Sequence, residues 1–329
     1  MKSIIRCALA LSVLCAVSTH AVSASAVTWE MAGPLPEANF LTQNLRFFVD
    51  RVNTLSKGEL KLNLHVAGEL VKDQETKQAV RSGQIPIAEV YLYVYGNESP
   101  IYDVSTLPFI AGNGEKAFKL WTLSKPYIEE LLAKQNIKLL YTTPWPTQGF
   151  YTNKPIKSVA DFKNTKSRVY SSNTARLAQL MGSEPVQIVM SEISQAFATG
   201  LVDVMYTSPQ AGVQSQAWDF AKYFTYSYGG HRPMNAVIVN QRAYDKLNDT
   251  QKQALKDAAL DAQTRGWFAS EGSSEKEMKV LKEHGITLQD PSPEFLAALN
   301  KIGVQMLEEW AKKSGELGQK VLAEFGTKK

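Results

Sequence analysis

Residues 39–66 have the sequence NFLTQNLRFFVDRVNTLSKGELKLNLHV, in which two hydrophobic periodicities follow each other directly. Between residues 39 and 53 the apolar side chains recur at the spacing of a helix with one buried face. Gly58 interrupts this pattern. From Leu60 to Val66 apolar and polar residues alternate, which is typical of a strand. The stretch therefore predicts a helix followed at once by a strand, the repeating unit of an α/β fold.

The same alternation continues along the rest of the chain. Further helices are expected at residues 68–83, 115–135, 158–162, 174–181, 191–199, 247–266 and 293–325. Strands are expected at residues 27–31, 85–95, 137–142, 168–170, 202–206 and 236–240. We therefore expect an α/β chain with mainly parallel sheets. Because no single linker divides the sequence, two lobes would be joined by several chain crossings that act as a hinge.

The N-terminus has the features of a secretory signal peptide. Lys2 and Arg6 precede an apolar run over residues 7–17, and Ala24-Ser25-Ala26 forms an A-x-A cleavage site. A membrane anchor is the alternative, but no stop-transfer run or basic flank follows. We expect residues 1–26 to be removed and the protein to be exported to the periplasm.

This assignment excludes several classes of function. Both cysteines, Cys7 and Cys15, lie in the signal peptide, so no thiol chemistry is expected from residue 27 onward. The formal net charge of +4 falls by two when Lys2 and Arg6 leave, and a nearly neutral protein gives no support for a nucleic-acid partner. No later apolar run is long enough to span a membrane.

The sequence contains none of the common catalytic motifs. The G-x-S-x-G, G-x-x-x-x-G-K-[ST] and H-E-x-x-H patterns are all absent, and we expect neither a metal nor a cofactor. The histidines after the signal peptide are more consistent with structural roles than with metal ligation, because no two lie within four residues of each other: His65, His231 and His284. An exported hydrolase or lyase whose residues converge only in the folded state remains the alternative class.

Arg168 is the strongest candidate for binding an anion. It begins an apolar strand in the segment Lys166-Ser167-Arg168-Val169-Tyr170. Its forked guanidinium can hold a carboxylate through two parallel hydrogen bonds, although a surface arginine is an equally good interpretation of this segment alone. Aromatic residues at strand ends or beside prolines could form cleft walls or could lie in the core: Tyr91, Tyr93, Tyr95, Trp145, Phe150, Tyr170, Tyr206 and Trp218.

The order of short motifs from about residue 27 to beyond residue 244 resembles the solute-binding proteins of tripartite ATP-independent periplasmic (TRAP) transporters. Each motif is weak alone, and the ordered set carries the resemblance. The motifs are SKGEL at 56–60, GEL at 68–70, LPF at 107–109, NKPIKS at 153–158, KSRV at 166–169, GSEPV at 182–186 and GLVD at 200–203.

The resemblance implies a two-lobed periplasmic binding protein fold with an interlobe cleft, several chain crossings and a long helix spanning both lobes. We expect residues 27–150 mainly in lobe 1, residues 151–240 mainly in lobe 2, and residues 241–329 to form C-terminal helices that return across both lobes. The resemblance implies further that the protein is not an enzyme and that it delivers its ligand to membrane permease subunits driven by an ion gradient. The family's carboxylate-binding arginine corresponds to Arg168.

Departures from sialic-acid-binding relatives indicate the kind of ligand. Gln148 stands where those relatives have a second arginine, Thr207 where they have an asparagine, and Tyr91 where they have an acid. These changes remove charge and leave few partners for buried hydroxyl groups. We therefore predict a small carboxylate ligand, a monocarboxylate with an aromatic or otherwise apolar body, with a sugar acid or aliphatic dicarboxylate as the alternative. The expected ligand-binding residues are Arg168, Gln148, Tyr91, Trp145, Tyr170, Thr207, Tyr206, Glu69, Asn235 and Phe150.

Overall fold

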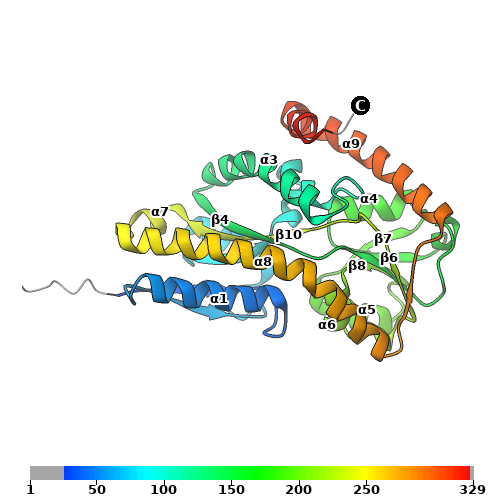
Figure 1. Cartoon of the computed structure of the whole chain (residues 1–329), viewed down its shortest axis with the longest axis horizontal. Coiled ribbons are helices and arrows are strands. Elements are labelled where there is room, and N and C mark those ends of the chain that lie inside the picture. The colour runs from blue at the N-terminus through cyan, green and yellow to red at the C-terminus, as the bar shows by residue number, and fades with distance from the viewer. Residues whose placement is uncertain (1–25, 327–329) are drawn as a thin grey trace, which may run out of the picture.

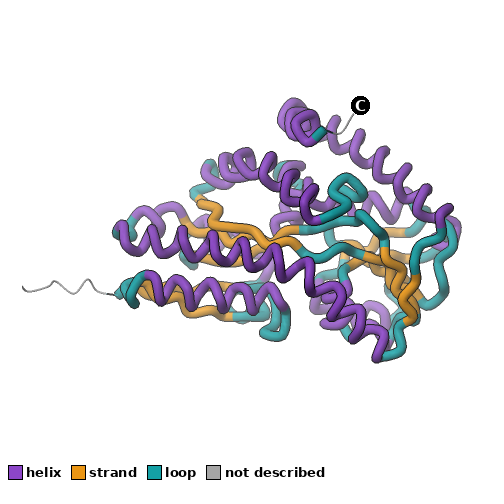
Figure 2. Tube along the Cα trace, in the orientation of Figure 1, coloured by secondary structure: helices purple, strands orange, loops and turns teal. Residues whose placement is uncertain are grey.

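The computed structural model describes residues 26–326, which form two β-sheets surrounded by helices (Figure 1). The signal peptide expected at residues 1–26 lies outside the described residues except for Ala26. No helix within residues 26–326 is long and apolar enough to cross a membrane. The strands lie in two groups, toward the left and the right of the view in Figure 2.

The first sheet has five strands in the order β2-β1-β3-β10-β4. Its strands are β1 (Val27–Ala32), β2 (Leu60–His65), β3 (Ile87–Tyr91), β4 (Ile137–Pro144) and β10 (Met234–Asn240). Side chains alternate between its two faces. Ile87 and Val237 belong to the core between the sheet and the helices α1 (Phe40–Leu55) and α8 (Asp249–Glu283). Ala88 and Ile238 face the core on the opposite side, which α2 (Asp73–Ser82), α3 (Gly114–Ala133) and part of α9 (Pro293–Phe325) cover.

The second sheet has six strands in the order β11-β9-β5-β8-β6-β7. Its strands are β5 (Gly149–Thr152), β6 (Lys166–Val169), β7 (Glu184–Gln187), β8 (Val204–Thr207), β9 (Tyr223–Tyr226) and β11 (Thr287–Gln289). The remaining α-helices are α4 (Ser172–Leu180), α5 (Ile193–Ala198), α6 (Pro209–Gln214) and α7 (Gln241–Asp245). Short 3-10 turns are η1 (Leu92–Tyr95), η2 (Pro100–Thr106), η3 (Val159–Phe162), η4 (Met190–Glu192) and η5 (Ala217–Asp219).

Both sheets are mixed, which corrects the expectation of mainly parallel sheets. In the first sheet β10 is antiparallel to β3 and β4, and in the second β5 is antiparallel to β8 and β9. Parallel neighbours in a sheet need a long crossover connection. β5 and β10 instead each follow a strand of the other sheet directly, through residues 145–148 and 227–233. β10, which the sequence assigns to the second lobe, therefore belongs to the first sheet.

The start of α2 and the end of β3 also differ from the sequence expectation. The helix expected from residue 68 begins only at Asp73, because Ala67 and Gly68 have positive φ angles and form a turn. The extended segment expected through residue 95 ends at Tyr91, where the chain enters the 3-10 turn η1.

The helix α8 joins the two sheets and confirms the expected long helix (Figure 1). Its 35 residues extend over about 52 Å. It contacts α1 and β4 beside the first sheet, and α6 and β11 on the side of the second. The chain also passes between the two halves at residues 145–148 and 227–233, and α9 runs from the core of the second sheet to the core of the first.

Close packing of α8 on the first sheet depends on Gly266. A Cβ atom at this position would lie 2.6 Å from Thr143 Oγ1 and 2.7 Å from Asn44 Nδ2. These contacts are shorter than side chains tolerate, so any larger residue must displace the side chains of Thr143 and Asn44. Gly272 on the same helix has no atom within 4 Å of the equivalent position.

The two glycines provide a matched test of this packing. Gly266→Ala should lower the free energy of unfolding by about 1–3 kcal/mol, because overpacking outweighs the gain in helix propensity. Gly272→Ala should raise it by about 0.5–1 kcal/mol, since only the propensity gain applies there. Urea unfolding of both variants measures the difference, and equal effects would contradict close packing at Gly266.

Candidate functional site

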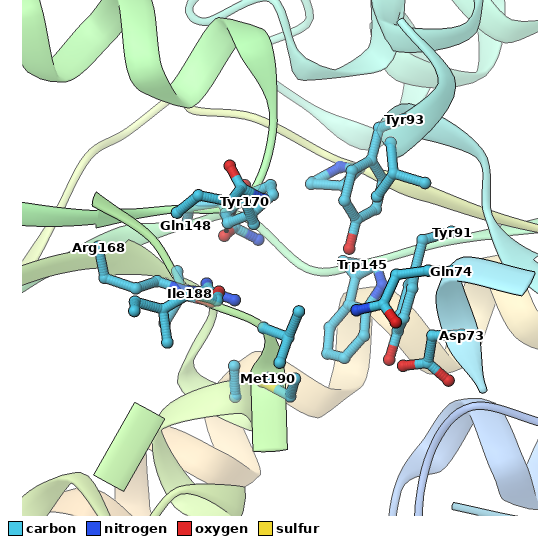
Figure 3. A pocket seen from close by; sticks show the side chains of 16 residues that line it. Asp73, Gln74, Tyr91, Tyr93, Trp145, Gln148, Arg168, Tyr170, Ile188 and Met190 are labelled. Carbon is cyan, nitrogen blue, oxygen red and sulfur yellow. Dashed lines mark hydrogen bonds between the residues drawn. The ribbon is translucent and has the colours of Figure 1, made fainter. Parts of the chain in front are cut away.

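A cavity of about 280 Å³ lies between the two sheets and is lined from both sides (Figure 3). Residues of α2, β3, η1 and the two crossings contribute Asp73, Gln74, Tyr91, Tyr93, Val94, Trp145, Gln148 and Pro233. Residues of the second sheet and its connections contribute Arg168, Tyr170, Gln187, Ile188, Val189, Met190, Thr207 and Ala211. In Figure 3, Arg168 lies at one end and Asp73 with Gln74 at the other.

Arg168 on β6 is a buried cation without a counter-ion. Its side chain is only 4% exposed, and its Nε donates to the carbonyl oxygen of Ile188 at 3.0 Å. No acidic side chain within residues 26–326 forms an ion pair with it. Burial lowers the pKa of Arg168, while Tyr170, Tyr93 and Tyr91 partly oppose this shift. A buried guanidinium is costly unless an anion pairs with it.

The guanidinium is not left in water, as an open cleft would leave it. The ring of Tyr170 lies beneath it, with 4.9 Å between the guanidinium carbon and the ring centroid. Together with the hydrogen bond to the carbonyl oxygen of Ile188, this covers part of the Arg168 guanidinium. An anion in the cavity would therefore replace missing protein partners instead of competing with an existing ion pair.

Aromatic rings form a continuous wall beside Arg168. Tyr93 packs edge-on against Tyr170 with 5.3 Å between ring centroids, and Tyr91 lies 5.8 Å from Tyr93. Burial raises the pKa of all three phenols, so each is neutral at physiological pH. On the first-sheet side, Trp145 meets Phe40 edge-on at 6.3 Å. Such walls suit a compact, flat ligand body.

Two polar residues from the sequence prediction, Gln148 and Thr207, also line the cavity. Gln148 donates through Nε2 to the carbonyl oxygen of Pro146 at 3.0 Å and accepts through Oε1 from the Tyr170 hydroxyl at 3.3 Å. These bonds fix the direction of its amide group. Thr207 lies at the end of β8 and is 5% exposed.

Six of the ten residues expected from the sequence line this cavity: Arg168, Gln148, Tyr91, Trp145, Tyr170 and Thr207. Four do not. Phe150 is fully buried in the core of the second sheet, where it packs against Phe162 and Phe295. Tyr206 shares that core, and its hydroxyl pairs with Ser227 Oγ at 3.0 Å.

The other two, Asn235 and Glu69, also do not line the cavity. Asn235 is buried behind Trp145, whose indole Nε1 donates to Asn235 Oδ1 at 2.9 Å. Glu69 is exposed in the turn before α2. The acid that lines the cavity is Asp73, four residues further along the chain.

Sequence reasoning missed Asp73, Gln74 and Tyr93 as site residues. Tyr93 was recognisable only as one of several aromatic residues, because its position depends on the turn η1. Asp73 begins α2, and burial raises its pKa. The apolar residues after β7, such as Ile188 and Met190, carry no chemical signal that distinguishes them from core residues.

A second buried ionisable group lies close behind the cavity. Glu89 on β3 is 2% exposed, and its Oε2 atom has no hydrogen-bond partner. Burial raises the pKa of Glu89 to about 8, and the Asn235 side chain opposes this shift only in part. At neutral pH the carboxyl group is therefore protonated in the folded protein.

The chain has the architecture of a two-lobed solute-binding protein, with a cavity between its two sheets. The family model of the bacterial extracellular solute-binding proteins, family 7 (DctP), matches residues 31–314. The chain belongs to this family, which consists of receptors, so the prediction that it is a periplasmic TRAP solute-binding protein and not an exported hydrolase or lyase is confirmed.

Solved structures and curated relatives agree with this assignment. The structure of DctP7, a Bordetella pertussis extracytoplasmic solute receptor binding pyroglutamic acid, is 38% identical, covers 91% of this chain and 99% of its own, and superposes with a TM-score of 0.88. A marine metagenome TRAP solute-binding protein specific for pyroglutamate is 32% identical over 92% of this chain and 100% of its own, also with a TM-score of 0.88. The sialic acid-binding periplasmic protein SiaP of Vibrio cholerae is 25% identical over 303 residues, 89% of this chain and 91% of that protein.

The buried carboxyl group of Glu89 predicts a specific pH dependence of stability. The pKa of Glu89 is higher in the folded protein than the ordinary value of 4.5. The contribution of Glu89 to the free energy of unfolding is therefore complete below pH 4.5 and is lost as the pH rises to about 8. Glu89→Gln does not titrate. The free energy of unfolding of Glu89→Gln, minus that of the wild type, should therefore increase by about 3 kcal/mol from about pH 4.5 to about pH 7.

Denaturant unfolding across this pH range measures the effect. Glu308→Gln, at an exposed acid on α9, is the control and should show no such trend. A constant difference between Glu89→Gln and wild type would mean that Glu89 is ionised in the folded state at neutral pH.

Proposed function

We propose that this protein binds a small monocarboxylate with a compact ring, of the pyroglutamate type, and delivers it to the membrane permease subunits of a TRAP transporter. The observation that carries this proposal is the buried, unpaired guanidinium of Arg168 at the wall of a small cavity between the sheets. The ligand carboxylate would accept two parallel hydrogen bonds from it. Relatives that are 38% and 32% identical are described as binding pyroglutamic acid and as specific for pyroglutamate.

The cavity contains one cation, which favours one carboxylate. In an aliphatic dicarboxylate the second carboxylate would approach Asp73, the acid at the far end, without a counter-ion. A sugar acid would bring several hydroxyl groups against a wall of phenol and indole rings, where few of them find partners. A planar five- or six-membered ring instead packs between Trp145 and the tyrosines.

The ligand would be held by residues of both lobes. Tyr91 and Asp73 come from the side of the first sheet, whereas Arg168 and Thr207 come from the second. With the lobe boundaries at the crossings at 145–148 and 227–233, the two lobes would close on the ligand by bending there. Closure would exclude water and strengthen the pairing with Arg168.

A calorimetric panel tests the choice of ligand. L-pyroglutamate should bind with a dissociation constant of about 1 µM or below. Galacturonate and succinate should bind at least about tenfold more weakly, a difference of about 1.4 kcal/mol. Benzoate reports whether an aromatic body without a lactam is sufficient. Tight binding of galacturonate or succinate, together with no binding of either ring monocarboxylate, would contradict the proposed ligand class.

Replacement of the arginine tests the anchor itself. Arg168→Lys keeps the charge but loses the two-pronged geometry, and Arg168→Ala loses both. Each should cost about 2–5 kcal/mol of binding free energy. The control is Arg176→Lys, at an arginine paired with Glu309 outside the cavity, which should leave affinity unchanged. If Arg168→Ala binds L-pyroglutamate within about threefold of wild type, the carboxylate is held elsewhere.

A further inference from the structure

We propose that Glu89 is a positioning residue that acts through Asn235 to hold Trp145 in the wall of the ligand cavity, and that ligand affinity depends on whether Glu89 carries its proton. The inference rests on the proposed function in one respect, that the cavity beside Trp145 receives a carboxylate. The positioning of Trp145 itself is independent of the ligand.

The sheet register brings Glu89 and Asn235 close together. Glu89 pairs with Val237, and Tyr91 pairs with Asn235, across the antiparallel strands β3 and β10. Glu89 and Asn235 are therefore diagonal neighbours on one face of the sheet, within reach of each other. The Asn235 side chain lowers the pKa of Glu89, against the larger effect of burial, and its Oδ1 accepts from Trp145 Nε1 at 2.9 Å.

The arrangement leaves defined atoms for a hydrogen bond between the two side chains. Asn235 Nδ2 and Glu89 Oε2 are both buried without a hydrogen-bond partner. The amide is a donor and the carboxyl oxygen an acceptor, so a hydrogen bond between them would satisfy both groups. This bond would fix the amide orientation that presents Oδ1 to the indole, since the opposite orientation would direct Nδ2 at another donor.

The groups around Glu89 do not provide a counter-charge. On β4, the Tyr141 hydroxyl is also buried without a partner, and its pKa is raised by burial and by Glu89. The charge of Arg265 of α8 lowers the pKa of Tyr141, but its guanidinium donates to Asn44 Oδ1 of α1 at 3.0 Å. Tyr91 and Tyr93, further along the chain, also have their pKa values raised in part by Glu89.

Ionisation of Glu89 would act on the ligand through two routes. A negative charge behind Trp145 would repel a carboxylate bound in the same cavity. It would also draw the Asn235 amide toward itself and change the hydrogen bond that the indole makes. By reciprocity, a bound carboxylate would favour the protonated form of Glu89. Because burial raises the pKa of Glu89 to about 8, both effects fall in an accessible pH range.

The first experiment needs no ligand. The Trp145 indole N–H resonance, labelled with nitrogen-15 and assigned with Trp145→Phe, is followed from about pH 6 to about pH 9.5. In wild type it should shift in one titration step near the pKa of Glu89, and in Glu89→Gln the step should be absent. Glutamine keeps the shape and the partner of the carboxyl group, and thermal unfolding confirms that the variant is folded. A wild-type resonance without a step, or the same step in Glu89→Gln, overturns the proposal.

The second experiment measures the affinity for L-pyroglutamate by calorimetry over the same range. Wild-type affinity should fall by about threefold or more between about pH 7 and about pH 9, whereas Glu89→Gln should stay within about twofold. Identical pH profiles in the two proteins would overturn the coupling to the ligand. If L-pyroglutamate does not bind to either protein at any pH, the proposed function fails, and the resonance of Trp145 still decides whether Glu89 positions the indole.

Discussion

The guanidinium of Arg168 is buried between the two sheets, and no acidic side chain of residues 26–326 pairs with it; the rest of the site is organised around this constraint. Burial of a charge costs free energy unless hydrogen bonds and an opposite charge compensate it. The protein provides one backbone carbonyl, which accepts from Nε, and the face of Tyr170. The other N–H donors of Arg168 are left for a ligand in the cavity that Arg168 lines. Under the proposed function, the carboxylate of the ligand would supply the missing opposite charge.

The two sheets form opposite walls of the cavity that Arg168 lines. β4 leads through Trp145 and Gln148 into β5, and β9 leads back through residues 227–233 into β10. The cavity is therefore lined at the places where the chain crosses between the sheets. The helix α8, packed closely on β4 at Gly266, connects the same two halves on another side.

Much of this architecture could be predicted from the sequence, because hydrophobic periodicity is a local property. The helix and strand in residues 39–66, the long C-terminal helices and the position of Arg168 on a strand all follow from short-range patterns. The cavity residues could be predicted only in part. Tyr206 and Thr207 are adjacent on β8, but alternation directs Tyr206 to the core and Thr207 to the cavity, and the sequence does not reveal which face is which.

The remaining errors come from backbone features outside regular elements. The positive φ angles at Ala67 and Gly68 delay α2, so that Asp73 lies at the cavity and Glu69 is exposed. Similarly, the antiparallel insertion of β10 brings Asn235 behind Trp145, a relation that depends on sheet register. Pairing across strands that are distant in the sequence determines this register, and no local pattern encodes it.

A crystal structure of the protein with L-pyroglutamate tests the central claim most directly. The account predicts that the ligand carboxylate lies within hydrogen-bond distance of both terminal nitrogens of Arg168, with the ring between Trp145 and the tyrosines. A carboxylate bound elsewhere in the cavity, with Arg168 paired to a protein acid or to water alone, would contradict it.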